Sequence, residues 1–508
     1  ARIPSDDCGA AVRCHSHAPR ESLGEAADRR RYSKTLFTFM MAHLSERRRE
    51  ILFFVMLSLI AAAALLVSTR NILDSPRPWF DEGIYLQAAR HLAETGRFGI
   101  VVAPGQESNL AFVTVGYPLI VSLATVFQLT GPTFEAARGT MVAFLVATVI
   151  AAGLCARALG GRKSGLAAAA LVASFPPLYG NGKNVLGEVP GIFFLLLSVI
   201  FLQRISRSRG RRLSDWLLFG MAAVLATATK PQFLMVVPAA VLAVLLLRRA
   251  GAVSSWRGPL VAAGAFAVGL AVWGVTQFGG LPSPTVFFHY TNPYGVADVG
   301  ATVLRNIVGF VSDPTPLHLL FIAGLTGLGW LVRRRVSAVE AYMGVVAIAV
   351  WAAYFRTAGW YRYFFIAHIL FLVLLPVSWR GMRSVYARGV ALVVLVLLLA
   401  SNGYAYARDP APLFGTDWRA LRTQMQQIDP DAGVFFANAP EAAFFFHGRE
   451  FGQYLRVTDR LCIGALPPLS EALPEWLVAS DELSEIESYL PEYRLVARHG
   501  HVAVWQRR

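Results

Sequence analysis

Long apolar runs recur through most of this 508-residue sequence, and they constrain its fold more than any other feature. Hydrophobic residues make up 55% of the chain and charged residues only 16%, whereas about a quarter of the residues in a typical soluble domain are charged. A helix needs about 20 apolar residues to cross a bilayer, and many of these runs approach that length. The sequence therefore predicts an all-α polytopic membrane protein.

Clusters of arginine and lysine separate the apolar runs and predict which loops face the cytoplasm, because basic residues are retained on that side. The clusters lie at residues 47–49, 157–163, 204–212, 248–249, 333–335 and 380–388. Between them we expect eleven spans, at 51–69, 137–156, 164–180, 190–204, 214–229, 231–247, 258–278, 316–332, 338–355, 361–377 and 389–405. The N-terminus then lies in the cytoplasm and the C-terminus outside. The net charge of +15 reflects these clusters, so we expect no nucleic-acid partner.

One further apolar run, at residues 116–131, conflicts with this topology. If it crossed the membrane, the basic clusters that follow it would face outside, against the positive-inside rule. We therefore interpret it as a re-entrant or interfacial helix on the outer side. Residues 70–136 then form one long external loop with juxtamembrane helices. Such a loop is long enough to be functional and too apolar to be disordered.

The chain divides into three parts by composition. Residues 1–46 are polar, lack periodicity and are predicted to form a disordered cytoplasmic tail. Residues 47–407 form the transmembrane domain. In residues 408–508 the pattern predicts a small periplasmic α/β domain, with helices at 416–428 and 481–490 and strands at 433–438, 476–480 and 493–506. The four cysteines form no CxxC or Cys/His pattern, so neither a disulfide framework nor a metal site is indicated.

Two adjacent acids, Asp81 and Glu82, lie near the start of the stretch WFDEGIYLQAARHLAETG, just after the first span. Apolar residues recur there every four positions, which predicts an amphipathic helix along the membrane surface that ends near Gly96. Asp81 would then be the N-cap, with Glu82 favoured by the helix dipole. The alternative is a catalytic role, and a cap position would also hold a carboxylate rigidly. Tyr85, on the same helix, is a candidate substrate-binding residue.

A second isolated acid, Glu188, lies in GNGKNVLGEVPG between two predicted spans on the same outer face. It is the only acidic residue between Glu135 and Asp215. Lys183, which precedes it, is a candidate substrate-binding residue. A single carboxylate at a helix entrance is most often a cap. Ionisable groups at membrane depth are nevertheless often functional, so we also consider a role shared with Asp81.

Three cations are expected at the outer boundary: Lys230 between two spans, and Arg356 and Arg362 beside another. One interpretation is that they anchor the helices at the interface. The other is that they bind an anionic phosphate, for which arginine offers a bidentate fork. These cations stand out because basic residues are sparse on that side. His289, with Tyr290 beside it in a long external loop, is a further candidate for the same cavity.

The sequence contains no P-loop, zinc-protease or serine-hydrolase motif. Several of its segments do resemble those of the GT-C membrane glycosyltransferases, in the branch of the protein O-mannosyltransferases and the lipid A aminoarabinose transferases. The matching segments are WFDEGIYLQAARHLAETG, GYPLIVSLATVFQLTG, KNVLGEVPGIFFLLL and GMAAVLATATKPQFLMVVPA. The resemblance extends over residues 47–250 and, weakly, over 361–377. The acidic pair is its most specific element.

The resemblance implies an inverting transfer of a sugar from a polyprenyl-phosphate donor to an acceptor on the outer face. By motif position, it implies that Asp81 acts as the general base or organises the site, with Glu82 beside it. It also implies that Glu188 is the acid of the second loop and that Lys230 contacts the phosphate. The chemistry agrees, because an acceptor hydroxyl needs a carboxylate within reach and a leaving phosphate needs positive charge. We expect Arg362 to hold the phosphate as well.

Two departures from the family pattern are visible. Many relatives carry a lysine before a double proline ahead of the re-entrant helix, whereas this chain has Val115-Gly116-Tyr117-Pro118. That difference removes a phosphate contact from this loop and weakens an assignment to aminoarabinose. The chain also has no DxD signature, so a divalent metal is not indicated and we expect no cofactor.

We therefore expect a multi-pass glycosyltransferase of the bacterial inner membrane, with its active site on the periplasmic face. Its partners would be a polyprenyl-phosphate sugar, an envelope lipid, glycan or protein acceptor, and the membrane lipids. Two alternatives remain open: a transporter or flippase of lipid-linked glycans, and a non-catalytic subunit of polysaccharide assembly. The ionisable groups collect at one face rather than inside several spans, which favours the enzyme. Neither the sugar nor the acceptor is identified by a linear motif.

Overall fold

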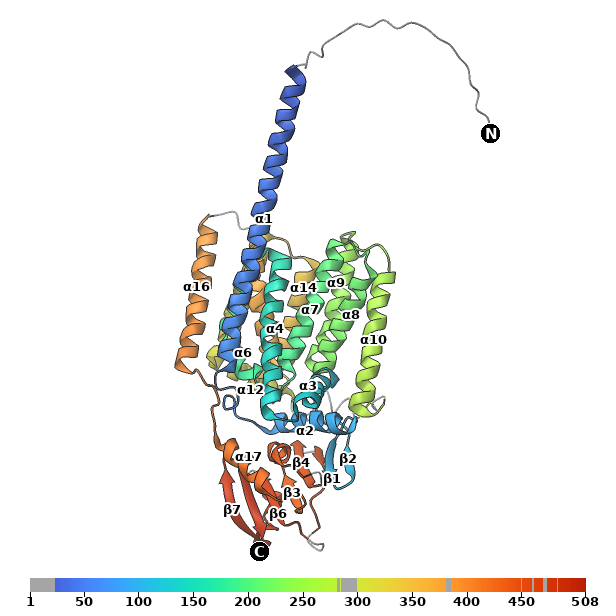
Figure 1. The fold of residues 1–508 in the computed structure, drawn as a ribbon, viewed down its shortest axis with the longest axis vertical. Coiled ribbons are helices and arrows are strands. Elements are labelled where there is room, and N and C mark those ends of the chain that lie inside the picture. Colours follow the sequence, from blue (N-terminus) through green and yellow to red (C-terminus); the bar gives the residue numbers. More distant parts are fainter. Residues whose placement is uncertain are drawn as a thin grey trace, which may run out of the picture. The chain divides into compact units, whose positions relative to one another are not determined.

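A computed structural model describes residues 23–280, 284, 299–380, 385–448, 450–458, 461–468, 473–481 and 483–508 of the chain. The chain forms two compact units, residues 1–55 and 56–508. The first unit contains the beginning of helix α1 (Leu23–Thr69). The second contains the other elements, a bundle of helices followed by a C-terminal sheet (Figure 1).

The helices after α1 comprise α-helices and short 3-10 helices (η). They are α2 (Phe80–Thr95), α3 (Tyr117–Thr130), α4 (Phe134–Gly160), α5 (Arg162–Ser174), α6 (Pro176–Gly182), α7 (Glu188–Arg207), α8 (Leu213–Thr229), η1 (Pro231–Met235), α9 (Val236–Arg249), α10 (Arg257–Phe278), α12 (Val299–Ser312), α13 (Pro314–Arg333), α14 (Ala338–Tyr354), η2 (Tyr361–Tyr363), α15 (Phe365–Ser378), α16 (Val385–Arg408), α17 (Asp417–Gln427), α18 (Pro440–Phe445), η3 (Ser484–Ile486) and η4 (Leu490–Glu492).

Among the described residues, seven helical segments are long and apolar enough to cross a membrane. They are Glu46–Thr69, Phe134–Gly160, Glu188–Arg207, Pro231–Arg249, Arg257–Phe278, Pro314–Arg333 and Gly389–Arg408. Shorter apolar helices occupy Tyr117–Thr130, Leu213–Thr229, Val299–Ser312, Ala338–Tyr354 and Phe365–Ser378. Large apolar side chains such as Leu245 and Leu260 are exposed on the bundle, as contact with lipid requires. The protein is a multi-pass membrane protein, and a helix lies in each of the eleven predicted spans.

Two predicted segments differ from the observed helices. The predicted span 164–180 is broken at Phe175, because Pro176 begins a new helix and disfavours helical backbone in the residue before it. The predicted loop 279–315 contains α12, which buries Asn306 and leaves apolar side chains exposed. The amide of Asn306 donates to the carbonyl oxygens of Phe355 (3.1 Å) and Thr357 (2.9 Å), so a long-range contact positions α12.

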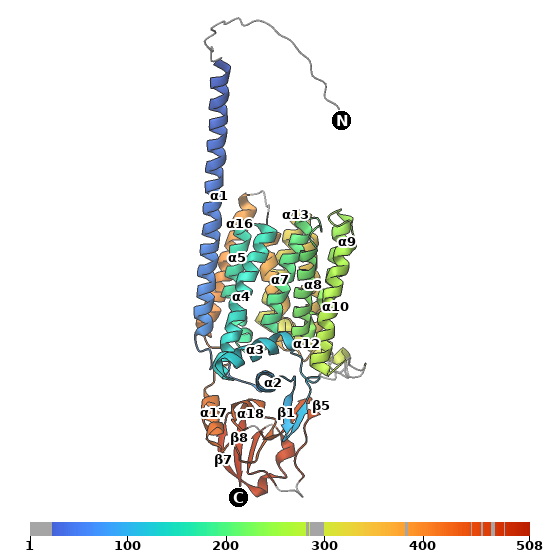
Figure 2. The same cartoon turned by 45° about the vertical axis from the view of Figure 1, so that its right-hand side comes forward.

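Helix α3 occupies the apolar run that conflicted with the predicted topology. Its 14 residues span about 21 Å, which is less than the roughly 30 Å of a hydrocarbon layer. Gly116 precedes it and packs so closely on the end of α8 that an added Cβ would lie 2.1 Å from the carbonyl oxygen of Ala228. In both views α3 lies beside α2 at one end of the bundle (Figure 2). These features support the interpretation that α3 does not cross the membrane.

Helix α2 is buried between other parts of the protein, so the prediction that it lies on the membrane surface is wrong. Every residue from Glu82 to Ala89 is buried, because α3 covers one side and α18 covers another. Gly83 permits the contact with α18, since an added Cβ would lie 2.3 Å from the backbone nitrogen of Glu441. The helix ends at Gly96, which has φ 74°, as predicted.

The C-terminal sheet has six strands in the order β5-β4-β3-β6-β8-β7. Their bounds are β3 (Val434–Ala437), β4 (Gly452–Thr458), β5 (Leu461–Ile463), β6 (Trp476–Ser480), β7 (Tyr493–His499) and β8 (Val502–Arg507). Strand β3 is parallel to both of its neighbours, and the other pairs are antiparallel. A separate hairpin, β1 (Ile100–Ala103) and β2 (Gln106–Ser108), follows α2.

The predicted elements of this domain agree with the observed ones only in part. Helix α17 and strands β3, β6, β7 and β8 lie where the sequence predicts them. The predicted helix 481–490 is wrong, because the described residues there form only the short helix η3 and turns before η4. Strands β4 and β5 were not predicted. They pair with each other and with β3, so distant partners stabilise them rather than a strong local pattern.

Asp74 connects the sheet domain to the chain that follows α1. Its carboxylate accepts hydrogen bonds from Trp418 Nε1 (3.1 Å) and from Arg419 Nε (2.9 Å) and Nη2 (2.5 Å). The Trp418 ring packs on Phe134 of α4, with the ring centroids 5.1 Å apart. One continuous apolar core joins α2, α3, the start of α4 and the sheet domain. The sheet domain therefore forms part of the structure around α2.

Replacing Asp74 with alanine is expected to loosen this junction. The change removes the acceptor of three hydrogen bonds, and the buried indole nitrogen of Trp418 then has no acceptor in Asp74. We expect the free energy of unfolding to fall by about 2–4 kcal/mol. The melting temperature in detergent and the rate of proteolysis between α16 and α17 measure the effect. Asp409→Ala, at an exposed acid nearby, is the matched control. Equal melting temperatures for the two variants would contradict this role of Asp74.

Candidate active site

The first turn of α2 places its two acids in different surroundings. The extended residue Trp79 takes the N-cap position, with φ −145° and ψ 175°, and its indole cannot accept a cap hydrogen bond. Asp81 and Glu82 are therefore the second and third helical residues, so the prediction that Asp81 is the N-cap is wrong. Successive helical side chains point about 100° apart, which separates the two carboxylates.

Glu82 is held in a buried ion pair with Arg138 of α4. One carboxylate oxygen accepts from Arg138 Nη2 at 2.7 Å, and the other accepts from the backbone N–H of Val185 at 3.0 Å. Both side chains are fully buried. Arg138 also donates to the carbonyl oxygens of Ile72 (3.3 Å) and Pro76 (3.0 Å). The pair thus connects α2 to α4, to the segment after α1 and to the loop before α7.

Asp81 points to a different cation, Arg362 in η2. Its Oδ2 lies 2.6 Å from Arg362 Nη1, across 281 positions of sequence. The guanidinium carbon of Arg362 lies 5.3 Å from the ring centroid of Trp79 and 4.6 Å from that of Trp360, within the range of cation–π contacts. Arg362 is 8% exposed and Asp81 is 31% exposed. The rings hold the cation in place, and the carboxylate is accessible.

A second pair, Glu188 and Lys230, lies where α7 begins and α8 ends. Lys230 Nζ donates to Glu188 Oε1, and both side chains are buried. The other carboxylate oxygen of Glu188 is buried without a hydrogen-bond partner among the described residues. Gly187 lets the two helix ends approach, because an added Cβ would lie 2.9 Å from the carbonyl oxygen of Thr229.

The two pairs are close enough to affect one another. Lys230 experiences the charges of Arg362 and Asp81 as well as that of Glu188, and Tyr85 experiences Asp81, Arg362 and Glu188. We call Asp81, Glu188, Lys230 and Arg362 the charged cluster. Burial, and then the Asp81 carboxylate, raise the pKa of Tyr85 well above its ordinary value. The Tyr85 hydroxyl, 3.4 Å from Thr114 Oγ1, therefore stays protonated and can donate a hydrogen bond.

The other predicted site residues are not part of the charged cluster. Lys183 is buried and donates to the carbonyl oxygen of Arg70 at 3.2 Å. Burial, and then the charge of Arg138, lower the pKa of Lys183 to about 8. Arg356 is exposed on the turn after α14. His289 lies outside the described residues, as does Tyr290.

Two residues at this end of the bundle were not singled out from the sequence. Arg138 was read as part of a span, although an arginine inside an apolar run could have indicated a buried partner. The ring of Trp79 contacts Arg362, and its Nε1 is buried without a partner among the described residues. Arg138 and Trp79 each contact a residue that is distant in the sequence, so no local sequence pattern indicates the partner.

Metal ligands do not gather at this site. Within the described parts of the chain, no three His, Cys, Asp or Glu side chains lie close enough together to hold a metal ion. Asp81 and Glu188 each face a cation instead. The arrangement presents two cations and a partly accessible carboxylate at one end of an apolar bundle.

Similar proteins share this architecture. A family described as dolichyl-phosphate-mannose-protein mannosyltransferase matches residues 118–275, which include Glu188 and Lys230. The structure of ArnT from Cupriavidus metallidurans bound to undecaprenyl phosphate matches with a TM-score of 0.63 at 14% identity, over 88% of this chain and 97% of that chain. This chain has the GT-C membrane glycosyltransferase fold. The resemblance expected from the sequence, to the protein mannosyltransferases and the aminoarabinose transferases, is confirmed.

A second structure with the GT-C fold is more distant. It is the archaeal oligosaccharyltransferase AglB from Archaeoglobus fulgidus, in complex with an inhibitory peptide and a dolichol-phosphate. Its TM-score is 0.52 at 12% identity, over 91% of this chain and 74% of that chain. No curated protein matches this chain. A single fold can host many different activities. The residues of the charged cluster are therefore the better guide to the function of this chain.

Breaking the pair of Glu82 and Arg138 is expected to destabilise the whole protein. Arg138→Met leaves the Glu82 carboxylate buried without its cation, a cost of about 3–5 kcal/mol, whereas Glu82→Met/Arg138→Met leaves neither charge and recovers much of the loss. Thermal unfolding in detergent would compare wild type, the single variant and the double variant. If the double variant unfolds at or below the melting temperature of the single variant, charge pairing is not what makes these residues necessary.

Proposed function

We propose that the protein is an inverting glycosyltransferase of the bacterial inner membrane. It transfers a sugar from a polyprenyl-phosphate donor to an envelope lipid, glycan or protein at the periplasmic face. The observation that carries the proposal is the charged cluster, with two acid–cation pairs at one end of an apolar bundle. A transfer of this kind requires a base for the acceptor hydroxyl and positive charge for the departing phosphate. Structures of the same fold hold undecaprenyl phosphate and dolichol-phosphate, which supports the donor class.

Arg362 and Lys230 are the groups that we assign to the donor phosphate. The guanidinium of Arg362 offers a fork that suits phosphate oxygens, and the rings of Trp79 and Trp360 orient it. Without donor, a carboxylate neutralises each cation. An arriving phosphate therefore competes with Asp81 for Arg362, and donor binding releases the Asp81 carboxylate. Lys230 keeps its contact with the fully buried Glu188, and its other N–H groups can donate to the phosphate.

Asp81 is the base in this proposal because it is the more accessible acid of the charged cluster. Once Arg362 turns to the phosphate, the carboxylate loses its charged donor and can accept the hydrogen bond of the acceptor hydroxyl. It takes the proton of the acceptor hydroxyl while that oxygen attacks the anomeric carbon of the sugar. The bond from the sugar to the phosphate breaks on the opposite side, and the polyprenyl phosphate leaves toward Arg362 and Lys230. Attack from the opposite face inverts the anomeric centre.

The remaining polar residues have supporting roles in this proposal. Glu82 is a positioning residue: its ion pair with Arg138 orients the first turn of α2 and hence Asp81. Tyr85, whose hydroxyl stays protonated, can donate to a sugar or phosphate oxygen. Lys183 and Arg356 lie outside the charged cluster, and we assign them no part in the reaction.

The proposed reaction requires a particular topology. We propose that the eleven predicted spans all cross the membrane, that residues 47–407 form the transmembrane domain, and that residues 408–508 form a periplasmic domain. The basic clusters then face the cytoplasm, and the charged cluster lies at the outer end of the bundle. The short α3 lies at that same end and supports this topology.

Asp81→Asn is expected to reduce sugar transfer by about 100- to 10,000-fold, the usual contribution of a general base, without lowering the melting temperature. The measurement uses purified protein reconstituted with radiolabelled polyprenyl-phosphate sugars and a panel of envelope lipids, glycans and proteins. Glu94→Gln on the same helix, where Glu94 forms an exposed pair with Arg90, is the matched control. Full activity of Asp81→Asn would overturn the assignment of the base. No transfer by the wild type to any acceptor would count against the enzyme itself.

Arg362→Lys is expected to weaken donor binding while preserving the charge. Lysine cannot form the bidentate contact, and the loss of one charge-assisted hydrogen bond corresponds to a rise of about tenfold in the KM for the donor. Initial rates over a range of donor concentrations measure this change. Arg356→Lys, at the exposed arginine on the neighbouring turn, is expected to keep the KM of the wild type. An unchanged donor KM in Arg362→Lys would refute the phosphate contact.

A further inference from the structure

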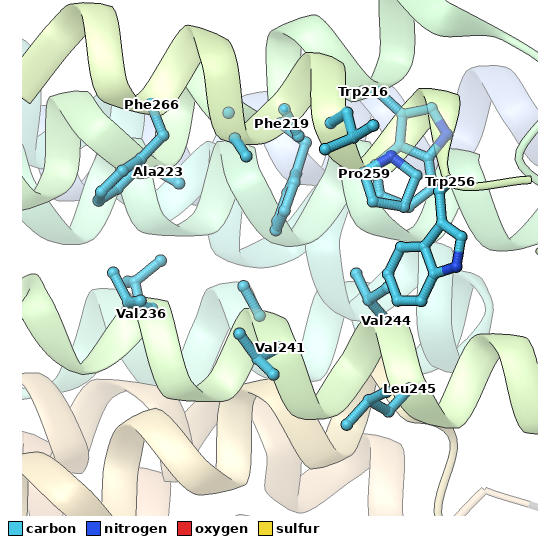
Figure 3. Close-up of a pocket in the computed structure, with 16 residues that line it drawn as sticks. Trp216, Phe219, Ala223, Val236, Val241, Val244, Leu245, Trp256, Pro259 and Phe266 are labelled. Atoms are coloured by element: carbon cyan, nitrogen blue, oxygen red, sulfur yellow. The ribbon is translucent and has the colours of Figure 1, made fainter.

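A groove lies between α8, α9 and α10, and part of its lining is exposed (Figure 3). Its volume is about 330 Å3, and its walls are apolar, including Phe219 and Ala223 of α8, Val241 and Leu245 of α9, and Phe266 of α10. Trp216, Trp256 and Pro259 lie together at one end of it. We call this feature the α8–α10 groove. None of the residues that line it belongs to the charged cluster.

The α8–α10 groove extends about half-way through a bilayer. Arg257 begins α10, and Phe266 lies nine residues further on, which corresponds to a rise of about 14 Å. The hydrocarbon layer is about 30 Å thick, so one leaflet occupies about half of that. The length of the groove thus matches an acyl chain of one leaflet.

The end of the α8–α10 groove that contains the tryptophans is strongly basic. The arginines of the two adjoining loops and helix ends are Arg209, Arg211, Arg212, Arg248, Arg249 and Arg257. Asp215 is the only acid between Glu188 and Asp298, and it is buried against Arg204 at 3.0 Å. An added Cβ at Gly210 would lie 3.2 Å from Val253, so the two loops lie side by side. Within the described parts of the chain, none of these six arginines forms an ion pair with a carboxylate.

Trp256 connects the basic end to the apolar walls. Its ring is 51% exposed and lines the α8–α10 groove. The guanidinium carbon of Arg248 lies 4.1 Å from the ring centroid, and Arg248 Nη1 donates to the carbonyl oxygen of Ser254 at 3.2 Å. These contacts hold a cation against the ring of Trp256, at the basic end of the groove. Tryptophan is enriched at the depth where lipid headgroups meet acyl chains.

We infer that the α8–α10 groove is a binding site for a membrane phospholipid with an anionic headgroup. One acyl chain lies between Phe219, Leu245 and Phe266, and the phosphate and its anionic headgroup contact Arg248 and Arg257. Basic pockets between transmembrane helices bind anionic headgroups in this way. The arginines at the basic end favour a lipid with a net negative charge over a zwitterionic lipid. The length of the groove matches an acyl chain that extends through one leaflet.

The donor lipid of the proposed reaction does not fit this site. Lys230, which we assign to the donor phosphate, lies 14 residues after Trp216, which corresponds to about 21 Å along α8. A donor whose phosphate lies at Lys230 would present only its tail to the α8–α10 groove, and the arginines at the far end would lack an anion. The inference is independent of the proposed function, since it needs only a multi-pass membrane protein with this groove.

Native mass spectrometry of the full-length protein tests the inference. The protein is exchanged from detergent into nanodiscs that contain equal amounts of phosphatidylglycerol and phosphatidylcholine with the same acyl chains. We expect one tightly retained phosphatidylglycerol, preferred over phosphatidylcholine by at least about tenfold. Arg248→Gln/Arg257→Gln is expected to lower retention by roughly 30-fold, because each cation near an anionic headgroup contributes about a factor of five. Ala263→Trp, which fills the groove, should abolish retention without altering the charge.

Matched controls separate this site from general attraction to charge. Arg334→Gln/Arg335→Gln removes two exposed arginines after α13, and Ala271→Trp adds the same bulk to an exposed position of α10 outside the groove. Both are expected to retain the lipid as the wild type does. Equal retention of the two lipids, equal losses in the test and control variants, or displacement of phosphatidylglycerol by stoichiometric undecaprenyl phosphate would each overturn the inference.

Discussion

The buried ion pair of Glu82 and Arg138 is the interaction on which the arrangement of the site depends. Removing two charges from water is costly, and the cost is recovered only when each charged atom finds close partners. The carboxylate of Glu82 and the two terminal nitrogens of Arg138 obtain these partners from four separate segments of chain. Each segment must therefore be in place before the pair is satisfied. Asp81 is the preceding residue, so the same contacts determine where its carboxylate points.

Three acid–cation pairs of this protein differ in how completely they are satisfied. In the pair of Glu82 and Arg138, both carboxylate oxygens have a partner. Asp81 is partly exposed beside Arg362, and Glu188 has an oxygen without a partner among the described residues. A carboxylate with both oxygens paired stabilises a structure, whereas one with an exposed or unpaired oxygen can exchange a partner for a ligand. The two carboxylates that can accept a further partner, those of Asp81 and Glu188, both lie at the end of the bundle near α2.

The sequence was sufficient to predict the helical bundle and much of the charged cluster. Apolar runs and basic clusters are local signals, and a helix lies in every predicted span. Asp81, Glu188, Lys230 and Arg362 stood out because charges are rare beside such runs. Their pairing was not predictable, since Asp81 and Arg362 are 281 positions apart. The same reason accounts for Arg138 and for strands β4 and β5, whose partners are distant in sequence.

The surface location expected for α2 was wrong because an amphipathic pattern does not distinguish a lipid surface from a second protein surface.

The close contact between Gly83 and the backbone of Glu441 has a consequence for how the protein is made. Helix α2 emerges from the ribosome early in synthesis. Glu441, in the segment that covers one side of α2, lies 358 residues after Gly83. At 5–20 residues per second, the ribosome needs about 20 to 70 s to produce that segment. During this time the helices can insert, while the outer side of α2 remains uncovered. The surroundings of Asp81 are thus completed near the end of translation, so a truncated chain would reach the membrane with its bundle formed and its site unfinished.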